Sequence, residues 1–182
     1  MAITIPDAPS FQDAIALTQQ LLEAAADSNT ALDTDAIAQL TGSVNGGRGF
    51  FVVYLTAEES PADQPTDAVL AALASNPETV NDLLVKNVVM SAAMTVTHHR
   101  NGDNAMVAMS QTTSDRSLAH IKGLLARGGP AAEDLANLVR TMGQALTHGT
   151  GEYKDFLDKW KYDAEQRITM ATAIAPIIES LG

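Results

Sequence analysis

The sequence predicts a mainly α-helical protein: an antiparallel helical bundle of about six to seven helices, with at most one minor two-stranded β-ribbon. Along most of the 182 residues, apolar side chains recur at steps of three and four, the spacing of one helix face. Short connections containing glycine or proline separate these segments. Aromatic residues make up only 4% of the chain, and small and aliphatic side chains dominate instead, a composition that suits helix packing.

The first half of the chain contains three helical patterns. Residues 10–26 begin with Ser10 and Asp13, which are spaced as a capping box, so an amphipathic helix is expected there. Shorter patterns cover 34–40 and 66–73, and each begins with a threonine followed by an aspartate, residue types that favour helix starts.

The apolar segment 50–56 is open to two interpretations. It is rich in β-branched and aromatic residues and follows the glycine-rich stretch 45–49, a pattern that predicts a flexible turn and then a buried strand. Only residues 3–5 offer a second strand. Either 3–5 pairs with 50–56 in a ribbon, or tertiary packing makes 50–56 helical, because periodicity cannot decide so short a run.

We expect one helical domain over 1–182. The chain is long enough to bury a core without disulfides, and it contains no cysteine. The loop 57–65, which contains two prolines, is the clearest possible internal boundary. The part before this loop would have a poor core by itself, so both sides are assigned to the same domain.

The segment 77–100 predicts an unusually apolar helix. Its apolar residues cover most of the helix circumference, so it must be enclosed, either by the rest of the bundle or by a second copy of the protein. Val80 to Val96 is the part expected to face that second copy.

Three more helices are expected after residue 103, over 104–126, over 130–148 and from about 152 to the end. The polar stretch 111–115 could interrupt the first of them, and Pro176 should kink the last. Because the connections between these helices are short, the last four helices should be sequential antiparallel neighbours.

Charge and hydropathy exclude several classes of partner. The net charge of −11 argues against a nucleic-acid surface and against an anionic membrane. No signal sequence is recognisable at the amino terminus, and the longest candidate membrane stretch, 80–97, is interrupted by polar residues. A cytoplasmic protein without nucleic-acid or membrane partners is therefore expected.

The segment 98–116, the hairpin tip formed by the ends of the 77–100 and 104–126 helices, is the most unusual in composition. Two rigid helices would hold its polar residues, so we treat it as a candidate site for binding a ligand or a partner. The candidate residues are His98, His99, Arg100, Asp103, Asp115 and Arg116.

Histidines suggest a second, alternative site. His99, His120 and His148 could hold a divalent metal if the bundle brought them together, but no recognised ligand spacing is present. A histidine in a last helical turn also interacts favourably with the helix dipole, which favours a capping role. No cofactor is indicated otherwise, and no catalytic residue is assigned.

These observations favour a non-enzymatic interaction or scaffold protein that acts as a homo-oligomer. Its expected partners are a second copy of itself, in a homodimer, and an unidentified protein. One alternative is a metal-dependent helical-bundle hydrolase that uses the histidine cluster. A second alternative is a carrier of a small apolar ligand. Neither an activity nor a substrate follows from the sequence.

Overall fold

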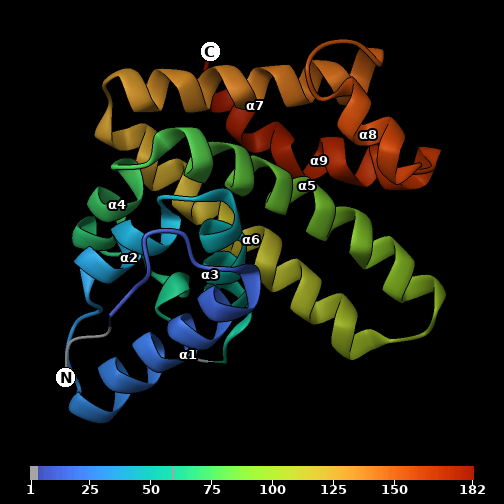
Figure 1. Cartoon of the computed structure of the whole chain (residues 1–182). Helices are drawn as coiled ribbons and strands as arrows, with labels where there is room; N and C mark the ends of the chain where they lie inside the picture. Colours follow the sequence, from blue (N-terminus) through green and yellow to red (C-terminus); the bar gives the residue numbers. More distant parts are fainter. Residues whose placement is uncertain (1–3, 59) are drawn as a thin grey trace. The chain divides into compact units, whose positions relative to one another are not determined.

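A computed structural model describes residues 4–58 and 60–182. Within these residues the chain forms nine α-helices and one short 3₁₀ helix, and no strand is present (Figure 1). The prediction of a mainly α-helical fold is confirmed. More helices are present than the predicted six to seven, because residues 44–56 are helical and the last predicted helix is divided into two.

The two-stranded ribbon of residues 3–5 with 50–56 is wrong, since 50–56 lies inside helix α3 (Val44–Thr56). Ile3 lies outside the described residues. The helix begins before the apolar run, where the hydroxyl of Ser43 accepts a hydrogen bond from the backbone N–H of Gly46 at 3.1 Å. Tertiary packing thus overrides the β propensity of this segment.

The chain divides into two compact units, Met1–Leu83 (unit 1) and Leu84–Gly182 (unit 2). The division falls inside helix α5 (Pro77–Arg100), and the proline-containing loop 57–65 lies within unit 1.

Unit 1 contains α1 (Phe11–Ser28), α2 (Thr34–Thr41), α3, the 3₁₀ helix η1 (Pro61–Asp63) and α4 (Asp67–Ala74). Helix α1 packs on α3, and α2 packs on both α3 and α4. The predicted capping box is present at the start of α1, where Ser10 and Asp13 each accept a hydrogen bond from the other's backbone N–H. Three stacked or edge-on aromatic rings, Phe50, Phe51 and Tyr54, fill the core beside these helices.

The glycine-rich stretch 45–49 is helical, so the predicted flexible turn is wrong. Its glycines allow close helix packing instead. A Cβ atom at Gly49 would lie 2.6 Å from Ala14 Cβ and 2.7 Å from the carbonyl oxygen of Phe11, both in α1. The absence of a side chain at Gly49 therefore lets α3 approach the backbone of α1.

Unit 2 contains most of α5, then α6 (Asn104–Arg127), α7 (Pro130–His148), α8 (Lys154–Trp160) and α9 (Ala164–Ser180). The expected interruption at 111–115 does not occur, because α6 runs through it unbroken. The last predicted helix is interrupted at Lys161, which adopts a left-handed conformation with φ of 54°. Asp163 then caps α9, which continues through Pro176.

Helices α5 and α6 form an antiparallel hairpin, as predicted, and the hydroxyl of Ser114 in α6 donates to the carbonyl of Val88 in α5 at 3.2 Å. Helix α7 packs on α6, α8 and α9, and Figure 1 shows α7 and α9 side by side. The apolar residues of α5 are buried within the chain itself: Val80, Leu84, Val85, Val88, Val89, Ala92, Ala93 and Val96. Their burial requires no second copy. Among the described residues, no helix is long and apolar enough to cross a membrane.

Candidate functional site

The structure spreads the candidate residues of the hairpin tip over α5 and α6. His98 is half-buried and His99 exposed, both in the last turn of α5. Asp103 caps α6, and its carboxylate accepts a backbone hydrogen bond at 3.1 Å. Asp115 and Arg116 lie about 18 Å farther along α6 at 1.5 Å per residue. The six residues therefore do not form one site, and their role in binding stays a prediction.

Two of these residues already have partners within α6 or the core. The carboxylate of Asp115 accepts a hydrogen bond from the side-chain amide of Gln111 at 3.0 Å. Arg116 is only 7% exposed and takes part in polar interactions, as expected of a buried charge. Neither side chain is presented as an open binding group.

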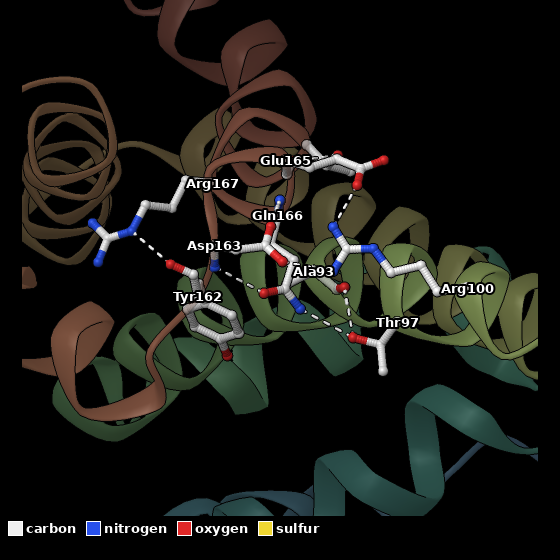
Figure 2. Close-up of polar contacts among 9 residues, drawn as sticks. Ala93, Thr97, Arg100, Tyr162, Asp163, Glu165, Gln166 and Arg167 are labelled. Atoms are coloured by element: carbon white, nitrogen blue, oxygen red, sulfur yellow. Dashed lines mark hydrogen bonds and ion pairs between the residues drawn. The ribbon is translucent and has the colours of Figure 1, made fainter.

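Arg100 links the end of α5 to the start of α9 (Figure 2). Its guanidinium donates to the carboxylate of Asp163 at 2.6 Å and also to the carboxylate of Glu165. The ion pair with Arg100 lowers the pKa of the Asp163 carboxyl to about 2, and the hydrogen bond from the Gln166 backbone acts in the same direction. The pKa of Arg100 is raised by the same hydrogen bonds.

A second contact strengthens this junction. The side-chain amide of Gln166 donates to the hydroxyl of Thr97 at 3.0 Å, while its oxygen accepts from the backbone N–H of Asp163 at 3.0 Å. Figure 2 shows both contacts beside the Arg100 ion pairs. Arg100 therefore joins the ends of two helices.

The histidines proposed as metal ligands lie in different environments. His120 is fully buried in α6, whereas His99 and His148 are exposed at the ends of α5 and α7. The Nδ1–H of His120 donates to the carbonyl of Arg116 at 2.7 Å. Burial lowers the pKa of His120, and this hydrogen bond partly opposes the shift. Across residues 4–58 and 60–182, no three side chains of the types that bind metals are gathered.

The best-formed concave surface lies in unit 1. A hollow of about 560 Å³ is bounded by the carboxyl-terminal end of α1, the connection to α2, the end of α3 and the start of α4. Its walls are mainly apolar, and they include Leu22, Ala25, Leu32, Pro61 and Val69. This volume is in the range of small-molecule sites in proteins.

A smaller hollow of about 440 Å³ adjoins the first one. The two hollows share Leu22, Glu23 and Ala57 as lining residues, and the smaller one extends between α1 and α3 to Ile15 and Val52. We call the two together the α1 groove. Val52 is 47% exposed.

The sequence contained only a weak signal for this site. Val52 and Val53 belong to the apolar run 50–56, and one turn of that run is more apolar than a buried helix face requires. Helical periodicity could have revealed these additional apolar residues only if 50–56 had first been assigned to a helix.

The model of the family described as "Uncharacterised conserved protein UCP020893" matches residues 10–177. No curated protein and no solved structure matches the chain.

Proposed function

Because the chain belongs to the UCP020893 family, whose description states no activity, we propose a function from the geometry alone: a non-enzymatic interaction protein of the cytoplasm that binds the apolar face of a partner in the α1 groove. The observation that carries this proposal is the mainly apolar lining that α1 and α3 supply, with Val52 exposed in it. The absence of cysteine suits a reducing compartment.

Binding in the groove would remove apolar surface from contact with water. Covering such surface releases about 25 cal/mol for each Å². Ile15, Leu22 and Val53 are half-buried in the free chain, and Val52 is more exposed than they are. A partner that covers these four side chains would gain free energy from a surface that is already formed.

A neutral amphipathic peptide tests this proposal. We expect a helical peptide of about 14 residues, with leucines on one face and glutamines on the other, to slow amide hydrogen exchange in residues 15–29 and 52–57 of the full chain. Val52→Ser should weaken its binding by about threefold to tenfold, as expected for lost apolar contact.

Val44→Ser is the matched control. Val44 is also an exposed valine of α3, at 60% exposure, but it does not line the groove. Equal loss of binding in both variants, or no protection of residues 15–29, would contradict the proposal.

The volume of the larger hollow favours a second candidate function, the carriage of a small apolar ligand. Native mass spectrometry of the unheated protein should then show a bound species at a ratio of one per chain. A purified protein whose mass equals that of the chain alone, and which takes up no Nile red, would count against this function.

Self-association is proposed as well. Met94 in α5 and Met109 in α6 are 37% and 45% exposed, and both lie within two turns of the hairpin connection, so they offer apolar surface to a second copy. Sedimentation at several concentrations should show a dimer that Met94→Ser and Met109→Ser together weaken. A strictly monomeric wild-type protein would refute this.

A further inference from the structure

The negative charge of the chain is concentrated in unit 1. Twelve of the 22 acidic residues lie in Met1–Leu83, together with only one of the 11 basic residues, Arg48. Leu84–Gly182 contains the other ten acidic and ten basic residues, so its formal charge is zero. The whole net charge of −11 therefore belongs to the unit that contains the α1 groove.

The groove itself carries the same sign. Its charged lining residues are Glu23, which borders both hollows, and Glu58, and both side chains are exposed. No lysine or arginine is among the lining residues of either hollow in the described part of the chain. The guanidinium of Arg48 lies over the ring of Phe11, 5.2 Å from its centroid, and Phe11 is at the other end of α1.

The shape of the groove suits a helix. Its lining residues on α1 include Ile15, Gln19, Leu22 and Ala26, which recur at steps of three and four residues and so form one face, and the cap residue Asn29 follows them. From Ile15 to Asn29 this face is about 21 Å long at 1.5 Å per residue. A partner helix of about 14 residues would match it, with apolar anchors one turn apart.

We propose that the α1 groove binds a basic amphipathic helix of a partner protein, whose lysines or arginines flank its apolar face and meet Glu23 and Glu58. The inference rests on the proposed function and adds the chemistry of the partner. Apolar contact would supply most of the affinity, while the opposite charges would speed association and exclude acidic helices.

Three peptides of about 14 residues test the charge of the partner. All carry the same leucine face, and the flanking positions are lysine, glutamine or glutamate. Fluorescence anisotropy with the full-length protein should show the lysine peptide binding at least about tenfold more tightly than the glutamine peptide at low salt, and the glutamate peptide more weakly than both. Added salt should reduce the lysine advantage because it screens exposed charges.

Variants locate the effect. Glu23→Gln combined with Glu58→Gln should reduce the preference for lysine over glutamine, while binding of the glutamine peptide stays unchanged. Glu133→Gln combined with Asp134→Asn removes the same amount of charge from exposed positions of α7, outside the groove, and should leave the preference intact.

The outcomes separate this inference from the proposed function. Equal binding of the three peptides, weakened by Val52→Ser, would overturn the basic helix and support the groove. Equally tight binding of the lysine peptide to Val52→Ser and to the variant with Glu23 and Glu58 replaced would reflect attraction to the acidic surface in general. That result would overturn the inference. Binding of none of the peptides would refute both. Binding of octylamine alone would overturn the helix in favour of a small amphiphilic amine.

Discussion

Asp163 owes its low pKa chiefly to Arg100, which makes its titration a test of the junction between α5 and α9. Its carboxyl has a pKa of about 2, below the ordinary 3.8, because Arg100 donates to it. Stability from this interaction is complete above pH 3.8 and is lost as the pH falls from 3.8 towards 2. We expect Arg100→Gln to move the pKa of Asp163 back towards 3.8, as measured by carboxyl NMR shifts.

Arg140→Gln is the control for this prediction. Arg140 also holds a chain end, since its guanidinium donates to the carbonyl of Leu181 at 3.2 Å, but it does not contact Asp163. A pKa of Asp163 that stays near 2 in Arg100→Gln would show that another group lowers it.

His120 also destabilises the fold as the pH falls, but at milder pH than Asp163. Burial holds its folded-state pKa below the ordinary 6.5, so the unfolded chain binds a proton first as the pH falls. Its neutral form stabilises the fold fully above pH 6.5, and this contribution decreases below 6.5, by at most about 1.4 kcal/mol per pH unit.

Urea unfolding of the wild type and of His120→Gln between pH 7 and pH 5 measures this effect. The other three histidines are present in both proteins, so their contributions cancel in the difference. We expect the wild type to lose more stability than the variant over this range, and parallel curves would contradict a buried neutral ring.

At the scale of elements, the close approach of α1 and α3 depends on Gly49. An added Cβ would meet Ala14 Cβ and backbone atoms of α1, which cannot move aside as a flexible side chain can. Gly49→Ala should therefore lower the free energy of unfolding by about 1–3 kcal/mol, the usual cost of overpacking.

Gly143→Ala in α7 is a matched control. A Cβ there would meet only the side chain of Ile178, with its Cδ1 at 2.4 Å, and that methyl group can rotate away. Because alanine also favours a helix by about 1 kcal/mol over glycine, this variant should be nearly neutral. Similar destabilisation of the two variants would show that helix approach is not what Gly49 provides.

Several helix boundaries followed from caps or breakers in the sequence, although the caps Ser43 and Asp163 were not identified. Ser10, Pro77, Gly102 and Pro130 each stand where a helix starts or stops. The segment 44–56 could not be assigned to a helix from the sequence. Its glycines allow α3 to contact α1, which lies about 34 residues earlier in the chain, and no local pattern reveals such a contact.

The division of charge between the two units affects the whole molecule. Self-repulsion among twelve acidic groups should loosen unit 1 at low ionic strength, while unit 2 has balanced charges. Raising the salt from about 20 mM to about 300 mM shortens the Debye length severalfold. Hydrogen exchange should then slow in α1 to α4 and change little in α6 to α9.

Sodium chloride and potassium chloride should act alike, since screening does not depend on the cation. Equal slowing in both units would indicate a general salt effect and contradict this prediction.

The sequence did not predict the candidate site, because the site combines residues that lie far apart in the chain. The hairpin tip stood out because its polar residues are consecutive, whereas the α1 groove joins Ile15, Val52 and Val69 from three separate helices. Helical periodicity predicts which side of a helix is apolar, but the space left between two such sides depends on how the helices pack.

The junction at Arg100 also has a direction. The carboxyl end of α5 carries partial negative charge and the amino end of α9 partial positive charge, so the cation on the former and the two carboxylates on the latter each lie at the favourable pole of their own helix. Exchanging the charges, as in Arg100→Glu with Glu165→Arg, would preserve an attractive pair yet place both charges at the wrong poles and set the new carboxylate at position 100 against Asp163. The signs of the two ion pairs therefore match the direction in which the two helices run.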